Sequence, residues 1–393
     1  MFNLNKKNLS EMKALQTAVE IYQQPTVWVE LISSLIQKKE NTQNFIQSIC
    51  HKHRFVRVIF TGAGTSAFAG DTLVPVLRKY NQKNKCLQFE SIPTTDIVSN
   101  PMEYLIGHVP TIMVSFARSG NSPESVAAVS LGKEIIQDFY QVIVTCNKDG
   151  KLAKNTEDDE NSITILTPDK ANDQAMAMTS SFTSMIIAAF TVFVDEDICE
   201  NSMKAVIESG KRLVDTVSNQ VDEILEFDFE RIIYLGSGIL GQLSHEAALK
   251  MLELSSGQVV AMHESSLGFR HGPKSILNDK TVVVLFVSQN PHTRKYDLDI
   301  LREISSDPSK LKVVVLTDKS DAEVEKLADW VIPVSPGNVE LSSDFDLALL
   351  YVIFAQVFAM KKSLQLGITP DNPSPNGRIN RVVQGVTIYD YIN

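Results

Sequence analysis

The chain has 393 residues, of which 44% are hydrophobic and 21% are charged, a composition typical of soluble globular proteins. Such a length allows more than one hydrophobic core, and two domains of roughly 170 residues each are expected. The formal net charge of −10 would repel nucleic acid over most of the surface, and no local basic stripe offsets it, which argues against a nucleic-acid partner.

Segments for export or membrane insertion are not expected. The opening MFNLNKKNLSEMK is too polar for a signal peptide, and the longest apolar runs, such as MIIAAFTVFV, are too short to span a bilayer. The four cysteines, Cys50, Cys86, Cys146 and Cys199, are far apart and form no CxxC pair, which argues against a disulfide framework and a zinc site. We therefore expect a cytoplasmic protein without a metal ion.

The chain repeats three features in the same order at an offset of about 170 residues. The segment VRVIFTGAGTSAFAG matches RIIYLGSGILGQLS, and TIMVSFARSGNSPES and QVIVTCNKDGKLAK match TVVVLFVSQNPHTRK and KVVVLTDKSDAEVEKLAD. Continuous Val/Ile/Leu strands alternating with amphipathic segments predict parallel sheets covered on both faces, the three-layer αβα arrangement. We predict N-terminal helices in residues 1–44, α/β domains in 45–205 and 210–365, and an extended tail in 366–393.

Two strand-turn-helix segments of the first domain are candidate phosphate-binding loops. In TGAGTSAFAG the glycines let the backbone approach a ligand, and hydroxyls and amides lie at a helix start. In ARSGNSPES, Pro123 suits the first helical position, and the residues before it would form a cup of amides and hydroxyls to which Arg118 adds a charge. Ordinary N-capping by Ser119 and Ser122 is the alternative. The candidate phosphate-binding residues are Gly64, Thr65, Ser66, Arg118, Ser119, Gly120, Asn121 and Ser122.

The most pointed chemistry lies in the second domain, in SHEAALKMLELSSGQVVAMHESSLGFRHGP. Glu246, Lys250 and Glu253 are spaced i, i+4 and i+7, so in a helix they project from one face. The helix follows a glycine loop, and such turns border the ligand crevice of open α/β sheets. A solvated surface pair is the alternative for Glu246 and Lys250. His271, in the FRHGP turn, is a further catalytic candidate, or it only completes the turn.

Other candidates carry a weaker signal. Ser180 and Ser181, in AMTSSFTSM, indicate either a further binding site at a helix start or a capped turn. His245 and His263 are as consistent with structural roles as with functional ones, and no carboxylate-histidine spacing supports a metal site. Both glycine turns fit the dinucleotide fingerprint G-x-G-x-x-G/A, but the expected acidic residue is not clearly supplied and SGNS has no role in that scheme. No cofactor is therefore expected.

Together, GAGTS, then SGNS, then HEAALKMLEL followed by FRHGP resemble the tandem sugar isomerase (SIS) domains in the isomerase half of glucosamine-6-phosphate synthase. The resemblance covers most of the chain. The end, ITPDNPSPNGRINRVVQGVTIYD, and the polar N-terminal helices look closer to the AgaS-type galactosamine-6-phosphate deaminase/isomerase family, also called tagatose-6-phosphate ketose/aldose isomerases. This resemblance implies two tandem SIS domains, a sugar-phosphate substrate and a homodimer or higher homo-oligomer.

The resemblance also implies roles for single residues. Glu253 falls on the base that moves a proton between the first two sugar carbons, with Lys250 and Glu246 beside it. His271 falls on the histidine that opens the sugar ring and comes from the neighbouring subunit. The chain departs from the synthase because it has no glutaminase domain, and because Gln384 stands where the synthase has its Schiff-base lysine. Synthesis with ammonia from glutamine is therefore not expected.

The residues support the same chemistry by themselves. Aldose-to-ketose conversion needs an open chain and a base that moves a proton from the second carbon to the first, and Glu253 can serve both steps. With an amino sugar, hydrolysis of the resulting ketose imine releases ammonia. We predict a deaminating isomerase that converts galactosamine-6-phosphate into tagatose-6-phosphate and ammonia. The alternatives are an isomerase of a plain hexose phosphate and a sugar-phosphate-binding regulator, although no clear helix-turn-helix supports the regulator.

Overall fold

The computed structural model describes residues 1–82, 86–194, 196–335, 337, 339–383 and 385–391, and for residues 196–202 only the backbone. Gln384 and the side chain of Cys199 therefore lie outside the described residues. The helices are α1 (Lys6–Glu11), α2 (Leu15–Tyr22), α3 (Gln24–Lys52), α4 (Thr65–Tyr80), α5 (Thr94–Ser99), α6 (Pro101–Tyr104), α7 (Pro123–Ile135), α8 (Lys151–Lys154), α9 (Ser180–Phe193), α10 (Glu196–Leu225), α11 (Ile239–Leu254), α12 (Pro291–Ser305), α13 (Ala322–Leu327) and α14 (Asp344–Gln365). Three short 3-10 turns are η1 (Asp169–Ala171), η2 (Gly268–Arg270) and η3 (Pro273–Ile276).

Two parallel five-stranded sheets carry the fold. The first has the order β2-β1-β3-β4-β5 and the second the order β10-β9-β8-β6-β7, which is the same order when it is read from β7. All described pairings in both sheets are parallel. The strands are β1 (Val56–Thr61), β2 (Leu87–Ser91), β3 (Thr111–Ala117), β4 (Phe139–Thr145), β5 (Ser162–Leu166), β6 (Arg231–Gly236), β7 (Val260–Ser265), β8 (Thr281–Phe286), β9 (Lys312–Thr317) and β10 (Trp330–Pro333). The predicted α/β fold with two parallel sheets is thereby confirmed.

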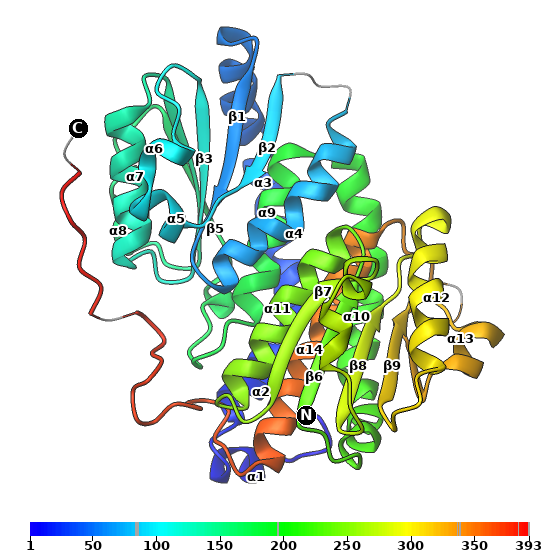
Figure 1. Cartoon of the computed structure of the whole chain (residues 1–393). Helices are drawn as coiled ribbons and strands as arrows, with labels where there is room; N and C mark the ends of the chain where they lie inside the picture. The colour runs from blue at the N-terminus through cyan, green and yellow to red at the C-terminus, as the bar shows by residue number, and fades with distance from the viewer. Residues whose placement is uncertain (83–85, 195, 336, 338, 384, 392–393) are drawn as a thin grey trace. The chain divides into compact units, whose positions relative to one another are not determined.

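The first sheet lies in a compact unit formed by Val27–Asp173, Ser180–Glu196 and Gly377–Asn393. Helices α5, α7 and α8 cover one face of this sheet, over an aliphatic core that includes Ile59, Met113 and Ile143 (Figure 1). Helices α4 and α9 cover the other face, where aromatic rings pack between the strands and α9. The unit therefore has three layers.

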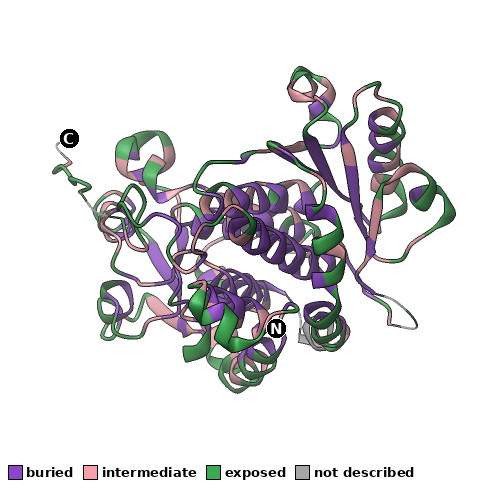
Figure 2. Ribbon diagram, turned by 90° about the horizontal axis from the view of Figure 1, so that it is seen from below, coloured by how far each residue is buried: buried purple, intermediate pink, exposed green. Residues whose placement is uncertain are grey.

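The second sheet lies in the other compact unit, formed by Met1–Thr26, Gln174–Thr179 and Asp197–Asn376. Helices α12 and α13 pack on one face of this sheet and α11 and α14 on the other (Figure 1). Buried residues, purple in Figure 2, gather on the strands and the helices that face them. The predicted boundaries at 44/45 and 205/210 fall inside helices α3 and α10, whereas the predicted end of the second domain at 365 coincides with the end of α14.

Helix α14 corrects one expectation about apolar segments. It has 22 residues and is apolar enough to cross a membrane by length and composition, so the expectation that every apolar run is too short to span a bilayer was wrong. In the structure 94% of its apolar window is buried. Burial of this kind is what a core helix of a globular domain requires, so the helix is weak evidence for a membrane span.

The two glycine turns explain why the helices α4 and α11 begin in the same way. Gly64 has φ 56° and ψ −130°, and Gly238 has φ 57° and ψ −127°. Residues other than glycine rarely adopt this backbone conformation. A Cβ atom on Gly62 or Gly236 would lie 2.6 Å from a main-chain carbon four residues further on. Each turn therefore needs both of its glycines, and each leads into a helix of 16 residues.

Candidate active site

Helix α11 brings the three predicted charged residues together. Lys250 Nζ lies 2.6 Å from Glu253 Oε2 and 3.4 Å from Glu246 Oε1. The side chains of Glu246 and Lys250 are fully buried, whereas that of Glu253 keeps 22% of its surface exposed. Glu246 and Lys250 are therefore not a solvated surface pair. Glu253 is the member of this set that solvent, and so a ligand, can reach.

The charge state of Lys250 follows from its surroundings. Burial acts to lower the pKa of Lys250, but the carboxylates of Glu246 and Glu253 outweigh burial, and the net pKa lies above the ordinary lysine value. Lys250 is thus held as an ammonium between two carboxylates. In this low-dielectric position it can polarise a hydroxyl or oxyanion that comes within reach of Glu253.

His271 lies on an exposed turn between η2 and η3. Its main-chain N–H donates to the Gly268 oxygen, and among the described residues no hydrogen bond or ion pair joins its ring to the charged set of α11. The turn is anchored to α12 by Arg270 and Lys274, which both contact the Glu303 carboxylate at 2.5 Å. The structure thus fixes the turn but leaves the His271 ring available.

His245 and His263 form a stacked pair beside this region. His245 follows Ser244 on α11 and His263 lies on β7, with ring centroids 3.9 Å apart and an interplanar angle of 16°. Burial, and then the neighbouring His263, lower the pKa of His245 to about 4. The His245 ring is therefore neutral near pH 7. No group of three potential metal-binding side chains occurs among the described residues.

In the first unit, the loop after β3 holds its predicted residues at the start of α7. Ser122 is the N-cap residue of α7, but its side chain makes no capping hydrogen bond. The Ser119 hydroxyl accepts from the Asn121 amide at 3.3 Å, and Gly120 has a positive φ of 68°. The Asn121 side chain accepts from the Lys151 amide at 3.0 Å and so caps α8. Ordinary N-capping of α7 therefore does not account for Ser122, and the Asn121 oxygen is engaged by the first amide of α8, whose own N-cap residue, Gly150, has no side chain.

The loop after β1 and the residue Arg118 complete this group. Gly64 is the N-cap residue of α4 and has no side chain, and Thr65 and Ser66, in the first turn, are 4% and 5% exposed. Arg118 is also buried, and its Nη2 donates to the Arg381 carbonyl at 2.7 Å. Because β1 and β3 are adjacent, the loops after them lie at the same edge of the sheet, where open α/β sheets bind ligands.

Ser180 and Ser181 lie elsewhere in this unit, at the buried N-terminus of α9. Asp173 accepts from the Ser180 amide at 3.1 Å and from the Ser181 amide at 2.9 Å, and also from the Ser181 hydroxyl at 2.5 Å. An internal carboxylate thus occupies this helix start. Of the two interpretations left open by the sequence, the geometry supports the capped turn.

Three charged residues without a sequence motif of their own also lie near these groups. Arg381, in the C-terminal tail, donates through Nε to the Asp173 carbonyl at 3.0 Å and holds Arg118 through its own carbonyl. Glu124, in the first turn of α7, is 9% exposed, and its Oε2 has no hydrogen-bond partner among the described residues. Asp297, on α12, is fully buried. In the sequence, each of the three is marked only as a charged residue that lies near a candidate motif or in the tail.

Comparison with known proteins agrees with this architecture. Residues 227–361 match the SIS domain family. The chain is 39% identical over 376 residues to D-galactosamine-6-phosphate deaminase AgaS of Escherichia coli, covering 95% of this chain and 96% of that protein. It is 38% identical over 389 residues to the protein of the same name from Shewanella sp. strain ANA-3, covering 99% and 95% of the two chains.

The chain belongs to the AgaS family. A crystal structure of tagatose-6-phosphate ketose/aldose isomerase from Escherichia coli matches with a TM-score of 0.87 and 36% identity, over 96% of this chain and 97% of that one. The resemblance stated from the GAGTS, SGNS and HEAALKMLEL motifs is thereby confirmed over nearly the whole chain. Within the AgaS family, relatives carry names for a deaminase and for an isomerase.

Proposed function

We propose that this chain is a deaminating isomerase that converts D-galactosamine 6-phosphate into tagatose 6-phosphate and ammonia. The observation that carries the proposal is the buried ammonium of Lys250, held 2.6 Å from Glu253, the partly exposed carboxylate of the set. Membership of the AgaS family, whose Escherichia coli relative is named for this deamination, supports the choice of substrate. The reaction needs no metal or organic cofactor.

The chemistry balances with one carboxylate as base. Glu253 takes the proton from the second carbon of the open-chain aldehyde, and the C–H electron pair forms a double bond to the first carbon while the aldehyde oxygen gains a proton. The same carboxyl group returns the proton to the first carbon, which leaves an imine at the second. Water adds to that imine, the C–N bond breaks and ammonia leaves. Lys250 would stabilise the negative charge that develops on oxygen, and His271 would exchange the protons that open the ring.

The phosphate is assigned to the loops of the first sheet. The α7 N-terminus without a side-chain cap, with hydroxyls from Ser119 and Ser122, and the Arg118 charge suit a dianion. Thr65 and Ser66, at the start of α4, would add a hydroxyl and main-chain amides. We assign no binding role to Ser180 and Ser181, because the Asp173 carboxylate already occupies their helix start.

The direct test is to assay the purified protein with galactosamine 6-phosphate for both ammonia and tagatose 6-phosphate. We expect the two products in equal amounts, and no product from galactosamine without its phosphate. The matched variant Glu253→Gln keeps the shape of the side chain and should abolish both products. Absence of turnover with every hexosamine and hexose 6-phosphate in a panel, despite binding, would instead support a regulator.

A plain aldose-ketose isomerase is the second candidate, because the matching Escherichia coli crystal structure carries that name. The same panel separates the two. An isomerase would interconvert galactose 6-phosphate and tagatose 6-phosphate faster than it releases ammonia from the amino sugar. The deaminase proposal requires the opposite order.

The proposal includes a homo-oligomer that works in the cytoplasm, with His271 acting on the site of a neighbouring subunit. Its exposed position and lack of described contacts with α11 are consistent with this role. Cys50, Cys86 and Cys146 are free thiols, as a reducing compartment would leave them. Mixing inactive Glu253→Gln and His271→Ala proteins tests the sharing: activity returns only if the two residues act across subunits.

A further inference from the structure

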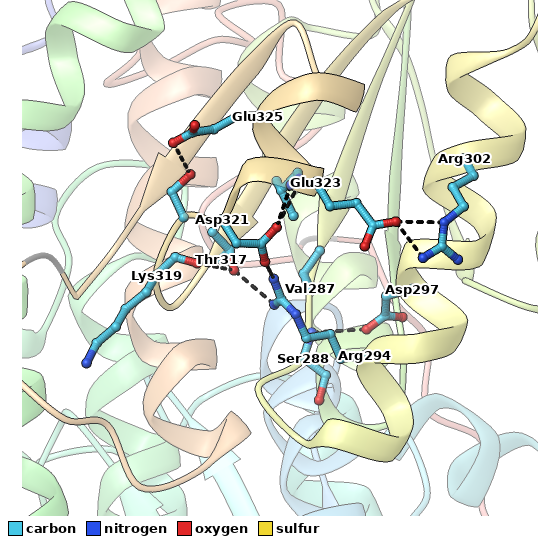
Figure 3. A network of polar contacts seen from close by, with 12 residues as sticks. Val287, Ser288, Arg294, Asp297, Arg302, Thr317, Lys319, Asp321, Glu323 and Glu325 are labelled. Atoms are coloured by element: carbon cyan, nitrogen blue, oxygen red, sulfur yellow. Dashed lines mark hydrogen bonds and ion pairs between the residues drawn. The ribbon is translucent and has the colours of Figure 1, made fainter.

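A buried carboxylate on α12 joins three loops of the second sheet. Asp297 Oδ1 accepts from the hydroxyls of Ser237 and Ser266, each at 2.6 Å. Asp297 Oδ2 accepts from the main-chain N–H of Ser288 at 3.0 Å, a bond drawn in Figure 3. The side chain is fully buried, and Ser266 and Ser288 are buried as well. The Ser266 hydroxyl and the Ser288 amide therefore depend on this one carboxylate in a place that water does not reach, and the Ser237 hydroxyl reaches it from a partly exposed position.

The three donors mark a particular point of the sheet. Ser237 follows β6, Ser266 follows β7 and Ser288 comes two residues after β8, and these are three adjacent strands. Between β6 and β8 the chain connections diverge, which is the switch point where open α/β sheets hold their ligands. In the first sheet, the loops that correspond to those after β6 and β8 follow β1 and β3, and these are the loops that we assign to phosphate. In the second sheet, the place of a bound anion is thus taken by Asp297.

The repeat has no such carboxylate in its first half. Helices α7 and α12 both begin with proline, at Pro123 and Pro291. Asp297 is the seventh residue of α12, and the seventh residue of α7 is Val129, which is buried in the aliphatic core of the first unit. Burial of a carboxylate costs free energy unless its oxygens accept hydrogen bonds. Where the first half has Val129 and the second has Asp297, the second half therefore also supplies serine donors around the carboxylate.

Asp297 touches both segments that carry the proposed chemistry. Ser237 directly precedes Gly238, the N-cap residue of the helix that bears Glu253 and Lys250. Ser266 lies five residues before His271, and its main-chain N–H also donates to the Gly236 carbonyl at 2.9 Å. The carboxylate is therefore the shared acceptor that ties the start of α11 to the turn of His271.

We propose that Asp297 is a positioning residue, a built-in anion at the switch point of the second sheet that holds the start of α11 and the His271 turn in register. This proposal rests on the proposed function for its effect on turnover, but its effect on the loops stands on the hydrogen bonds alone. Removing the carboxylate leaves the buried donors of Ser266 and Ser288, and the partly exposed Ser237 hydroxyl, without their acceptor. Displacement of a reacting group by about 1 Å can slow a reaction about 100-fold.

The experiment compares Asp297→Ala and Asp297→Asn in the full-length protein. Glu323→Gln is the matched control. It removes a carboxylate of the same network (Figure 3), but Glu323 lies in an exposed ion pair with Arg302. For each variant we would measure kcat and KM for ammonia release, and hydrogen-deuterium exchange of segments 236–240 and 265–272. Assays of Asp297→Ala are repeated with formate, which can refill the space of the lost carboxylate, and with chloride at equal ionic strength.

We expect Asp297→Ala to lower kcat about 100-fold with KM changed only a few-fold, and to speed exchange in those two segments. Formate should restore both, saturably, whereas chloride should not. Wild type and Glu323→Gln should not respond. Should Asp297→Ala fail to fold, Asp297→Asn and Ser266→Ala must still show the kcat loss and the local exchange.

Unchanged kcat and exchange in the Asp297 variants would overturn the proposal. So would exchange that rises over the whole chain with no response to formate, because that pattern means a merely structural residue. If wild type releases no ammonia, the proposed function fails, while the exchange data with and without formate still decide the role of Asp297.

Discussion

Helices α7 and α12 occupy equivalent places in two sheets of the same strand order, yet their first turns differ. Asn290 caps α12 by accepting from the amides of His292 and Thr293, and Ser122 makes no such bond at the start of α7. The amides at the start of α12 are thus bound by the Asn290 side chain, whereas the start of α7 has no side-chain cap, and the Ser125 amide donates to the Ser122 carbonyl at 3.1 Å. We propose that, through a few side chains, one half of this fold holds an anion at a place that the other half closes.

The helices after the glycine turns show the complementary difference. Helices α4 and α11 each have 16 residues, and the positions of Glu246, Lys250 and Glu253 on α11 are Thr72, Val76 and Lys79 on α4. These lie on the same helical face in both halves. The shared backbone thus places the residues, and in our proposal the side chains alone decide which half performs proton transfer.

The largest effect on turnover is expected from loss of the proposed base, Glu253. Glu253→Gln should lower kcat about 1,000-fold, because general base catalysis contributes at this scale. Lys79→Gln, at the equivalent position of α4, should leave kcat unchanged. Steady-state assays of ammonia release measure both variants. Comparable losses in the two would mean that the halves do not differ as proposed.

The second effect concerns stability. Lys250→Met leaves Glu246 buried without its counter-ion, which should cost about 3–5 kcal/mol of unfolding free energy near pH 7. The deficit should shrink toward pH 5, because an unpaired buried carboxylate has a raised pKa and takes up a proton on folding there. Adding Glu246→Gln to Lys250→Met should recover much of the loss. Urea unfolding at both pH values checks this, and a deficit independent of pH would contradict it.

The third pair of variants should act in opposite ways on the two halves. Ser122→Ala should raise KM about 10-fold, as for a lost hydrogen bond to a charged group, without changing the unfolding midpoint, because Ser122 caps nothing. Asn290→Ala should instead cost about 1 kcal/mol of stability through the lost cap and leave KM unchanged. Steady-state kinetics and thermal unfolding of both variants measure these effects. The same change of KM and of stability in both would contradict the proposed difference between the two halves.

The smallest effect comes from His245. Its pKa is lowered to about 4 from the ordinary value of 6.5 by burial, so the unfolded chain takes up the proton first as pH falls. The protein should therefore lose stability between these two values, and His245→Phe, which keeps a ring against His263, should lose less. Unfolding midpoints at about pH 7 and about pH 5 measure the difference. An equal loss in both proteins would rule out His245 as its source.

Much of the fold could be predicted from the sequence, because its signals are local. Continuous Val/Ile/Leu strands and paired glycine turns predicted parallel sheets in two repeats, and the i, i+4, i+7 spacing predicted the charged face of α11. That face could not be recognised as buried, because helix α11 packs against α14, about a hundred residues away in sequence. The Asn121 side chain likewise turned out to cap α8, a partner that no local pattern reveals.

The overlooked residues share a physical reason. Asp297 accepts from serines that lie in three different loops, and Arg381 reaches Arg118 from a tail whose described residues form no helix or strand. Such contacts arise from topology and not from periodicity. The length of α14 could not be predicted for a related reason. Charged residues lie at both ends of its apolar stretch, and only the fold shows that 94% of this stretch is buried in the core.

We propose that Glu253 carries the proton between the first two sugar carbons while the first half of the chain holds the phosphate. The most direct test of this claim is turnover of saturating galactosamine 6-phosphate in heavy water, with wild type, Glu253→Gln and Ser122→Ala compared by NMR of the product. We predict deuterium at the first carbon of tagatose 6-phosphate with wild type and with Ser122→Ala, and none with Glu253→Gln. Deuterium incorporation by Glu253→Gln at the wild-type rate would contradict the claim.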